Sequence, residues 1–452
     1  DKTRFIHYEE DITGKISDVF SEMYAHVEKM DALGQNKRVS HCFFTVFRPL
    51  GVSYSPAKYR DLPYIECEYA HCMGNSLGNF ADYWAKFKQY DRLAGGFIWD
   101  FADQAIKHVA EDGTVEYRYG GDFGDVPNAG VFSFNGIVKA DRTPNPALYE
   151  VRKQYQMVDF SYENGTITVK NGFMFTDIDK YELTLTFLTD GEETLTKKIV
   201  LGSVPAGEQC KIEIDAPETD GEQTVLCELR APNDDRVVAY EQFIVKEGTL
   251  DLTEPTGTMS CDEANYWEYR IYNDNVQYIV DKVTGGITSI KKGNVEILRS
   301  PVMPNFVRAT IDNDRYEQVD IPIVKKIMGV YKFHNAQKKI APKKNVRMEN
   351  KDGVVSVIMD WKFKYGKVST KYTFFNDGID MELMVKPRCE LVRYGFTFGM
   401  REAVKNMAFY ANGPFENYCD RNSAAILRKY EGVAEDFNHE YLSPQENGNH
   451  TG

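Results

Sequence analysis

Short apolar runs alternate with helical patterns over the first 150 residues. The apolar runs occupy residues 4–8, 63–69 and 95–101. The clearest helix follows the second run, behind Ser76, a residue type that caps helices, and places residues 77, 80, 81, 84 and 87 on one face. Strands that alternate with helices predict βα units around a parallel sheet, open or closed.

Two segments do not follow this alternation. In residues 16–27 the apolar positions fit a helix by their periodicity, but valine and aromatic residues equally suit a short buried strand that ends near Tyr24. The periodicity alone favours the helix. Residues 36–60 are basic and rich in aromatic residues without a clear period, so we expect a loop there.

After residue 146 the pattern is that of strands alone. Short β-type runs at 166–169, 181–187, 210–214, 225–229 and 237–245 are separated by turns that contain glycine and aspartate. About a hundred residues of this kind predict an immunoglobulin-like sandwich over residues 149–250. A linker rich in Thr, Pro and Gly leads into a second all-β region, residues 251–452, which is long enough for a larger sandwich.

Composition narrows the class of protein. The 452 residues suit about three domains. The net charge of −14 argues against nucleic acid or an anionic membrane as the main partner. No apolar run approaches the roughly 20 residues of a membrane span, and no signal segment opens the chain. Eight scattered cysteines without a CxxC pair indicate reduced thiols in the cytoplasm and argue against structural zinc. Neither chain end resembles a domain edge, so we expect part of a longer protein.

The densest group of reactive side chains runs from Glu66 to His71, where an apolar run ends. The carboxyl ends of barrel strands carry catalytic groups, so Glu68 is a candidate acid, base or nucleophile. The alternative is a surface glutamate at a strand end. Trp99-Asp100 at a second strand end supports the catalytic interpretation. Glu66 would share the strand face of Glu68 about 7 Å away, and we expect it to be ion-paired or solvated.

Other motifs carry less chemistry. The run Gly-Gly-Asp-Phe-Gly-Asp at 120–125 lacks the Lys-Ser/Thr ending of a phosphate-binding loop, which favours a tight surface loop. The eight histidines show no metal-binding spacing, and no GxSxG motif is present. The residues alone therefore indicate a carbohydrate- or ester-cleaving barrel with β-sandwich appendages.

Residues 67–78, Cys-Glu-Tyr-Ala-His-Cys-Met-Gly-Asn-Ser-Leu-Gly, closely resemble the nucleophile segment of bacterial β-galactosidases in glycoside hydrolase family two. The resemblance continues, in the same order, through residues 95–100, 119–125, 135–136, 140–144, 306–314 and 413–418. Matches in one order across nearly the whole chain are far more specific than a single short motif.

The resemblance implies a multidomain fold, α/β followed by all-β. Residues 1–148 would be the C-terminal half of a catalytic TIM (β/α)8 barrel, with strands over 4–8, 19–24, 63–68 and 95–100. Residues 149–250 would be the immunoglobulin-like β-sandwich. Residues 251–452 would be a large β-sandwich of the β-galactosidase small-chain type, incomplete at its C-terminus. The resemblance also replaces the helix over residues 16–27 by a strand that ends at Tyr24, and residues 36–60 match no part of the family pattern.

The family cleaves β-galactosides by double displacement with retention of configuration. One carboxylate attacks the anomeric carbon while a second carboxyl group, about 5–5.5 Å away, protonates the leaving oxygen. By position, the resemblance implies that Glu68 is the nucleophile and that Tyr24 hydrogen-bonds it. The acid/base glutamate would lie on a strand upstream of this chain.

Further roles follow from the same resemblance. His71 matches a substrate-binding histidine, Trp99 matches the aromatic platform under the galactose ring, and Glu9 is a weaker match to another active-site carboxylate. The carbonyl of Phe132 and the side chain of Asn135 match positions that bind Na⁺, a hard cation that prefers oxygen ligands. The family also implies Mg²⁺, with its ligands near the acid/base glutamate and outside this chain.

Two alternatives remain beside a β-galactosidase. One is a sister enzyme of the β-glucuronidase or β-mannosidase type, against which the 120–125 loop and the large final sandwich argue. The other is a sugar-binding or assembly fragment without turnover, which the missing acid/base supports. A general acid contributes about 10²–10⁴-fold, so we expect this chain alone to be nearly inactive on lactose. A homo-oligomer is in keeping with the family, but no residue pattern locates an interface.

Overall fold

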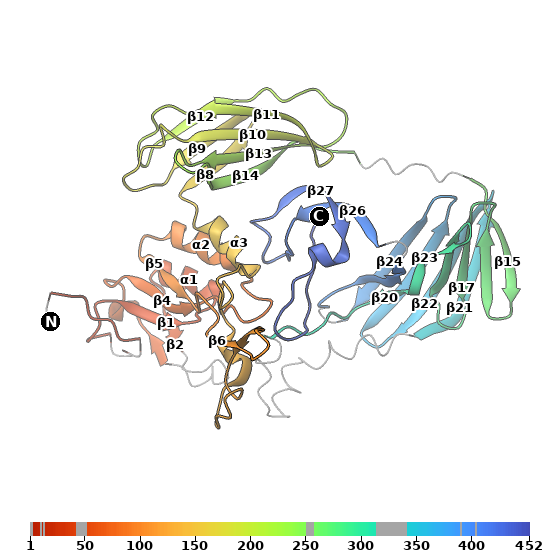
Figure 1. Ribbon diagram of the computed structural model, residues 1–452, viewed down its shortest axis with the longest axis horizontal. Coiled ribbons are helices and arrows are strands. Elements are labelled where there is room, and N and C mark those ends of the chain that lie inside the picture. The colour runs from red at the N-terminus through yellow and green to blue at the C-terminus, as the bar shows by residue number, and fades with distance from the viewer. Residues whose placement is uncertain are drawn as a thin grey trace.

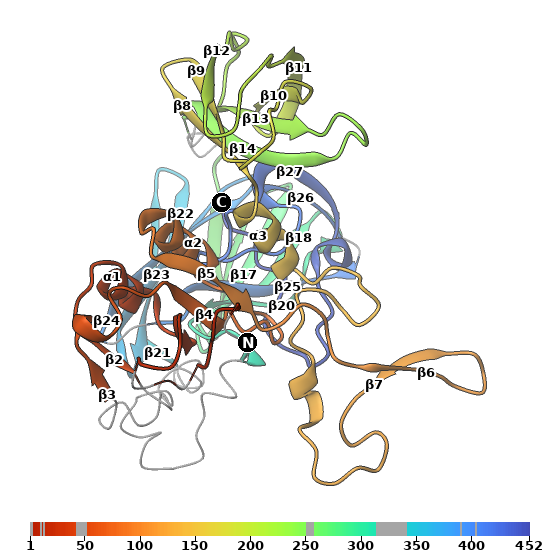
Figure 2. The same cartoon turned by 90° about the vertical axis from the view of Figure 1, so that its left-hand side faces the viewer.

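The computed structural model describes residues 3–9, 11, 14–41, 52–249, 257–312, 341–388, 391–402 and 405–452. Figure 1 shows three bodies: an α/β part with the N-terminus, a β-sandwich above it, and a larger β-sandwich on the far side. The last part of the chain leaves the larger sandwich and lies among the three bodies, and both Figure 1 and Figure 2 place the C-terminus there. This return brings the C-terminal segment close to the candidate site.

A parallel three-stranded sheet in the order β1-β4-β5 forms the centre of the α/β part. Helices follow the strands along the chain, and α2 packs against α1, α3 and β5. This is the βα arrangement that the pattern predicts. The elements are β1 (Phe20–Met23), α1 (Val27–Gly34), β4 (Tyr64–Tyr69), α2 (Phe80–Gln89), β5 (Leu93–Ile98) and α3 (Ala147–Gln154).

The segment 16–27 does not form the helix that its periodicity favours. Its centre is β1, which pairs with β4, and α1 begins only at Val27. Phe20 is buried and stacks on Tyr59 with 5.2 Å between the ring centroids. Pairing and aromatic packing with distant residues therefore override the local period. Tyr24 directly follows this strand, as the family resemblance implies.

The strand expected over residues 4–8 does not form. Phe5 is 88% exposed, so this run gains little from burial against a sheet. Its backbone is tied instead to Asp18, whose N–H donates to the Ile6 carbonyl and whose carboxylate accepts from the Ile6 N–H, both at 2.8 Å. The apolar residue types alone were a misleading signal here.

Two further boundaries differ from the predictions. α2 begins at Phe80 with Asn79 as its N-cap, and Ser76 is not a cap because its hydroxyl donates to the Gly74 carbonyl. The expected loop at 36–60 contains a short antiparallel pair, β2 (Val39–His41) with β3 (Val52–Tyr54), and a 3-10 turn at Pro56–Lys58. Residues 42–51 of that expected loop lie outside the described residues.

The loop at 120–125 is a tight surface loop, as predicted. The Asp122 carboxylate accepts a hydrogen bond from the Tyr119 N–H, and the Asp125 carboxylate accepts one from the Gly121 N–H, both at 2.9 Å. The preceding hairpin of β6 (Ile106–Val109) and β7 (Val115–Arg118) projects from the α/β part (Figure 2).

The middle body is a sandwich of two antiparallel sheets, β11-β10-β13-β14 and β12-β9-β8. Alternating apolar side chains from both sheets meet in one core, which includes Val169, Leu185 and Leu229. Four strands against three match the immunoglobulin-like expectation. The strands are β8 (Val158–Glu163), β9 (Thr166–Asn171), β10 (Glu182–Thr189), β11 (Glu192–Val200), β12 (Gln209–Glu213), β13 (Gln223–Arg230) and β14 (Val237–Lys246).

The third body is a larger sandwich, also as expected. One sheet has the order β15-β16-β17-β18-β20-β25 with β19 beside β18, and the other has the order β21-β22-β23-β24. Their core includes the buried side chains of Phe306, Trp361 and Phe374. The strands are β15 (Ser260–Asn265), β16 (Glu268–Tyr272), β17 (Val276–Asp281), β18 (Ile287–Lys292), β19 (Val295–Glu296), β20 (Leu298–Asn305), β21 (Ala341–Lys351), β22 (Val354–Phe363), β23 (Gly366–Phe374), β24 (Ile379–Pro387) and β25 (Gly395–Met400).

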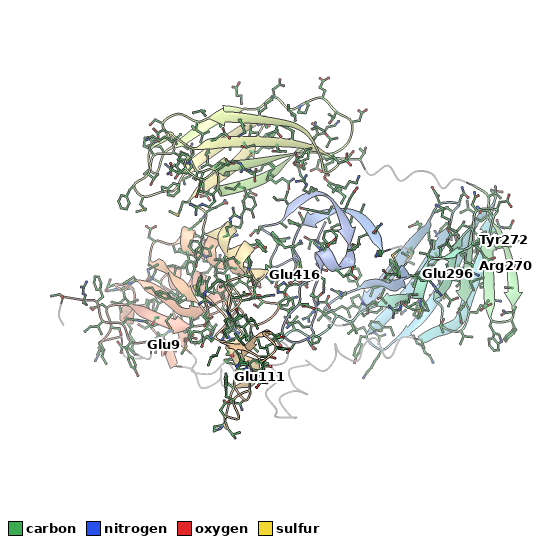
Figure 3. The ribbon with its side chains drawn as sticks, viewed as in Figure 1. Glu9, Glu111, Arg270, Tyr272, Glu296 and Glu416 are labelled. Carbon is green, nitrogen blue, oxygen red and sulfur yellow. The ribbon has the colours of Figure 1, made fainter. Side chains whose placement is uncertain are left out.

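The C-terminal segment contains a separate hairpin of β26 (Asn406–Gly413) and β27 (Ile426–Val433). The connection between these two strands reaches the α/β part, where Asn79 donates its N–H to the Asp420 carbonyl at 2.7 Å. Figure 3 shows Glu416 of this connection between the bodies. Among the described residues, no helix is both long and apolar enough to span a bilayer.

Candidate active site

The three parallel strands end at one edge of the sheet, and the candidate residues lie there. Tyr24 follows β1, Glu68 lies near the end of β4, and Trp99 follows β5. Backbone hydrogen bonds continue past the strands: the Tyr24 N–H donates to the Glu68 carbonyl at 2.7 Å, and the Trp99 N–H donates to the Tyr69 carbonyl at 3.1 Å. The sheet therefore brings together the residues that the sequence assigns to separate strand ends.

Tyr24 and Glu68 form a side-chain hydrogen bond at the centre of this edge. Burial, and then the charge and hydrogen bond of Glu68, raise the pKa of the Tyr24 hydroxyl far above its ordinary value. Tyr24 therefore keeps its proton, and its hydroxyl donates a hydrogen bond to the Glu68 carboxylate. The Tyr24 backbone has a left-handed conformation with φ of 53°, which turns the chain away from the sheet immediately after β1.

His71 lies beside this pair. Its ring centroid is 6.1 Å from that of Tyr24 and 5.5 Å from that of Phe132. Burial lowers the pKa of His71, against the opposing charge of Asp100, which favours a neutral imidazole. Its Nε2 atom is buried without a hydrogen-bond partner in the described part of the chain. A substrate hydroxyl is the kind of partner that would satisfy this atom.

Asp100 and Asn135 form a second polar group behind Trp99. The Asp100 N–H donates to the Asn135 carbonyl at 2.7 Å, and the Asn135 amide donates to the Phe132 carbonyl at 3.1 Å. Within the described residues, Asp100 Oδ1 and Asn135 Oδ1 are both buried without a hydrogen-bond partner. Sequence reasoning named Asp100 only as a neighbour of Trp99, although an acidic residue directly after a strand was a usable signal.

The oxygens at this group are of the type that binds a hard cation. The buried Asn135 Oδ1 and the Phe132 carbonyl fit the donor set that the resemblance implies for Na⁺. The described residues offer no further candidate metal site, because no group of three or more His, Cys, Asp or Glu among them could hold a metal ion. Mg²⁺ therefore enters no step below.

Glu9 interacts with residues on and near β4. Its charge acts on Cys67, whose pKa burial and Glu9 raise to about 12, and on Tyr54. Figure 3 shows Glu9 in the α/β part. These interactions place Glu9 beside β4, and they do not link it to the Tyr24–Glu68 pair.

Glu66 differs from its sequence prediction, because it is not solvated and its carboxylate forms no ion pair with any residue in the described part of the chain. It is fully buried, and its carboxylate accepts hydrogen bonds from the Tyr64 hydroxyl at 2.5 Å and the Ala25 N–H at 3.2 Å. Burial is the main cause that raises its pKa to about 8. Gly96 leaves the necessary space, since a Cβ there would lie 2.7 Å from that of Glu66. The paired glycines at 95–96 were the sequence signal for this close approach.

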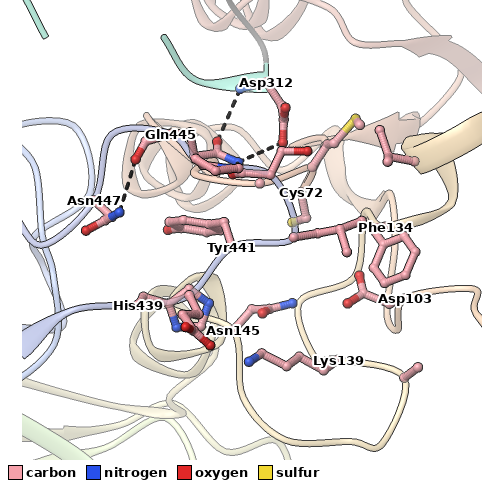
Figure 4. Close-up of a pocket in the computed structure, with 18 of the residues that line it drawn as sticks. Cys72, Asp103, Phe134, Lys139, Asn145, Asp312, His439, Tyr441, Gln445 and Asn447 are labelled. Carbon is pink, nitrogen blue, oxygen red and sulfur yellow. Dashed lines mark hydrogen bonds between the residues drawn. The ribbon is translucent and has the colours of Figure 1, made fainter. Parts of the chain in front are cut away.

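The sequence also did not reveal how the C-terminal segment covers the loop after β4. A cavity of about 540 Å³ lies between this segment and the α/β part, with Cys72, Asp103, Lys139, His439 and Tyr441 in its wall (Figure 4). Tyr24, Glu68 and Trp99 are not among the residues that line it. The cavity is therefore adjacent to the strand-end site and separate from it.

Family models match successive parts of the chain, in an order that agrees with this architecture. Residues 1–160 match the TIM barrel domain of glycosyl hydrolases family 2, residues 167–253 match β-galactosidase domain 4, and residues 272–452 match the β-galactosidase small chain. Among solved structures, a calcium-binding mutant of a β-glucuronidase from Bacteroides uniformis aligns at 12% identity and a TM-score of 0.23, over 82% of this chain and 44% of that one.

Curated relatives are β-galactosidases. Those of Priestia megaterium and Halalkalibacterium halodurans are 32% and 30% identical to this chain over its full length, which covers 43% and 44% of theirs. That of Enterobacter cloacae is 32% identical over 85% of this chain and 40% of its own length. The chain thus spans less than half the length of these relatives. With a family 2 barrel and two β-galactosidase domains matched in succession, and relatives aligned over its full length, the chain belongs to family 2 of the glycosyl hydrolases.

Proposed function

We propose that this chain supplies the nucleophile and part of the sugar site of a retaining β-galactosidase that cleaves terminal β-D-galactosides of the lactose type. The observation that carries the proposal is the hydrogen-bonded pair of Tyr24 and Glu68 at the carboxyl edge of a parallel sheet. The β-galactosidase relatives support the substrate class.

The domain assignment belongs to the same proposal. Residues 1–148 would be the C-terminal half of the catalytic barrel, residues 149–250 the immunoglobulin-like sandwich, and residues 251–452 an incomplete sandwich of the small-chain type. The parallel order β1-β4-β5 supports the first assignment, and the two antiparallel sandwiches support the others.

In the first step, a Glu68 oxygen attacks the anomeric carbon as the bond from that carbon to the leaving oxygen breaks. The product is a glycosyl ester on Glu68, and an upstream acid/base glutamate would protonate the leaving group. Water then attacks the anomeric carbon from the other face and releases the Glu68 carboxylate, while the upstream glutamate, now deprotonated, would take the proton of that water. Two inversions give net retention. Tyr24 orients the carboxylate by donating a hydrogen bond to it.

The surrounding residues would bind the sugar. Trp99 offers an aromatic face to the apolar C–H groups of galactose, and His71 offers a neutral imidazole with an unpartnered nitrogen. Asn135 and the Phe132 carbonyl would hold Na⁺, which binds hydroxyl oxygens when present. Glu9 remains a candidate sugar contact on the family resemblance alone. The free thiols of Cys67, Cys72, Cys210, Cys227, Cys261 and Cys419 are in keeping with a cytoplasmic location.

The test uses 2,4-dinitrophenyl 2-deoxy-2-fluoro-β-galactoside, whose leaving group requires no acid. Incubation of the folded chain, followed by intact and peptide mass spectrometry, should show one sugar on Glu68. Glu68→Gln should show none. The corresponding β-glucoside, which differs only at carbon 4, is the matched control for sugar specificity and should react more slowly. A folded chain that forms no adduct, or forms it elsewhere, would contradict the proposal.

Natural lactose should behave differently from the activated sugar. Because a general acid contributes about 10²–10⁴-fold, the isolated chain should turn over lactose at least about a hundredfold more slowly than a galactoside with a dinitrophenolate leaving group. Glucose release and absorbance measure the two rates. Equal rates would mean that this chain contains its own acid.

A further inference from the structure

The β4–α2 loop, residues 70–79, connects the strand of Glu68 to α2 and carries His71. Most of its side chains are buried, including Met73 at 1% exposure and Asn75 at 6%. Near its start the loop is held by the neighbouring strand end, because the Cys72 N–H donates to the Trp99 carbonyl at 2.9 Å. That single bond ties this part of the loop to β5.

The second half of the loop is held by residues more than 300 positions away. The Asn75 N–H donates to Oε1 of Gln445 at 3.0 Å, and the Asn75 side-chain amide donates to the Tyr418 hydroxyl at 2.7 Å and the Glu446 carbonyl at 2.8 Å. Arg421 donates to the Ser76 carbonyl at 2.6 Å. The conformation of the loop therefore depends on the C-terminal segment.

Gln445 uses both ends of its amide in this contact. Its Oε1 accepts from the Asn75 N–H and from the Asp312 N–H at 3.2 Å, while its Nε2 donates to the Asp312 carboxylate at 2.8 Å and the Ser443 carbonyl at 3.2 Å. Figure 4 shows Gln445 facing Asp312. A carboxylate at position 445 could not donate, and it would face the charge of Asp312 at 6% exposure.

Gly74 allows this close packing. A Cβ there would lie 2.4 Å from the Asp312 carboxylate and 2.6 Å from Oε1 of Gln445, and its φ of +59° is a conformation that other residues rarely adopt. The loop and the Gln445–Asp312 pair are thus fitted to each other. This fit lies at the cavity wall and outside the set of residues that would touch the sugar.

We propose that Gln445, together with Asp312, is a positioning residue that fixes the β4–α2 loop and so holds His71 and Glu68 in the geometry for attack. The inference rests on the proposed function of Glu68. His71 follows Glu68 by three positions, and the Gln445 contact at Asn75 lies four positions further on. Misplacement of reacting groups by about 1 Å costs about a hundredfold in rate, so loss of this anchor would act at the nucleophile.

Gln445→Glu tests the proposal in the full chain, because it keeps the size of the side chain, removes the donor and places a second carboxylate against that of Asp312. Two rates are measured: labelling of Glu68 by the fluorogalactoside and alkylation of the buried Cys72 thiol by N-ethylmaleimide, both by peptide mass spectrometry. We expect Cys72 alkylation to rise by at least about tenfold and Glu68 labelling to fall by at least about tenfold, because the variant loses the hydrogen bonds from Gln445 Nε2 to Asp312 and Ser443.

The second variant restores the pairing. Asp312→Asn added to Gln445→Glu places a donor opposite the introduced carboxylate, so both rates should return toward those of the unaltered chain. Gln223→Glu is the matched control, since Gln223 is a similarly buried glutamine at 4% exposure whose amide donates within the middle sandwich. It should change neither rate, and alkylation of Cys227 in that sandwich core should stay unchanged in Gln445→Glu.

The outcomes separate this inference from the proposed function. Unchanged Cys72 alkylation in Gln445→Glu would overturn the inference, as would faster alkylation with unchanged Glu68 labelling. Failure of the double variant to restore the rates would mean that the effect is general destabilisation, which also overturns it. If the unaltered chain is not labelled at all, the proposed function fails, and the inference that depends on it fails as well. The Cys72 alkylation rates would still report whether Gln445 holds the loop.

Discussion

Glu66 and Glu68 are two positions apart on β4, yet their surroundings are very different. Glu68 lies at the sheet edge with Tyr24, whereas Glu66 is enclosed by Tyr64, the Ala25 backbone and Gly96. The position of Glu68 at a strand end could be read from sequence. The burial of Glu66 could not, because its enclosing groups come from three separate strands or their ends. A strand pattern gives the face of a side chain but not what covers that face.

The raised pKa of Glu66, about 8 against an ordinary 4.5, predicts how stability depends on pH. Below about pH 4.5 the Glu66 carboxyl group is protonated in both the folded and the unfolded chain, and its contribution to the free energy of unfolding is at its maximum. Between these two values the unfolded chain releases the proton while the folded chain keeps it. The free energy of unfolding therefore falls by up to about 1.4 kcal/mol per pH unit, and the contribution is lost above about pH 8.

Glu66→Gln should remove this slope. Urea unfolding at several pH values between 5 and 8 should show the stability of the unaltered chain falling, relative to the variant, by about 3 kcal/mol. The exposed Glu213 of the middle sandwich provides the matched control, Glu213→Gln, which should leave the slope in place. A difference that stays constant with pH would contradict a protonated Glu66.

Tyr24→Phe removes the hydroxyl that donates to Glu68 and keeps the ring. Because a hydrogen bond to a charged group is worth about 1.5–3 kcal/mol, labelling of Glu68 should slow by about 10–100-fold. The dinitrophenolate released under saturating sugar measures the rate. Tyr162→Phe in the middle sandwich is a control of the same chemistry and should leave the rate unchanged. A Tyr24 variant that is labelled at the original rate would show that this hydrogen bond does not orient the nucleophile.

At the scale of the elements, the sequence pattern predicts a strand or helix correctly where burial follows from a residue's own position. It fails where pairing with a distant segment determines the structure. The alternating strands of both sandwiches were predicted because each residue's face follows from its own position. β1 was assigned to a helix by period, since its parallel pairing with β4 leaves no trace in residues 16–27. The start of α2 was placed too early, because Ser76 is committed to the β4–α2 loop by Arg421. The apolar run at 4–8 was wrongly taken as a strand.

The close contact of β4 and β5 can be tested at Gly96. A Cβ at this position would lie 2.7 Å from the Cβ of Glu66 and 2.9 Å from the Tyr69 ring, and neither neighbour can move without shifting its strand. Gly96→Ala should therefore lower the free energy of unfolding by about 1–3 kcal/mol. Gly395→Ala, where nothing lies within 4 Å, should have little effect. Denaturant midpoints of the two variants give the comparison, and equal midpoints would contradict the close strand contact.

At the scale of the whole molecule, the order of three bodies was visible in the sequence but their junction was not. α3 joins them: the Glu150 carboxylate accepts from the Ala424 N–H at 3.3 Å, and Lys153 pairs with Glu241 of the middle sandwich at 3.0 Å. Tyr149 stacks on Phe415 with ring centroids 4.2 Å apart. Each of these contacts joins two segments that are far apart in the sequence, and the hydrophobic pattern of neither segment indicates the other.

The buried ion pair of Arg421 and Glu416, 2.8 Å apart, is the most sensitive point of this junction. Arg421→Met would leave the Glu416 carboxylate buried without its partner, so unfolding should become easier by about 3–5 kcal/mol. Adding Glu416→Gln should recover part of this loss. Arg428→Met, which removes a half-buried arginine paired with the exposed Glu193, should cost less than about 1 kcal/mol. Thermal unfolding checks all three, and an Arg421 variant as stable as the Arg428 variant would contradict a buried charge pair.

The contact between Asn75 and Gln445 also sets an order in time, since 370 positions separate the two residues. A ribosome adds about 5–20 residues per second, so a nascent chain would wait about 20–70 s between making the first residue and making the second. Throughout that interval the β4–α2 loop would lack its contact with Gln445, however much of the preceding chain has already folded. Newly made molecules would thus become competent only after Gln445 has been made and has left the ribosome, and a shorter nascent polypeptide would not capture sugar.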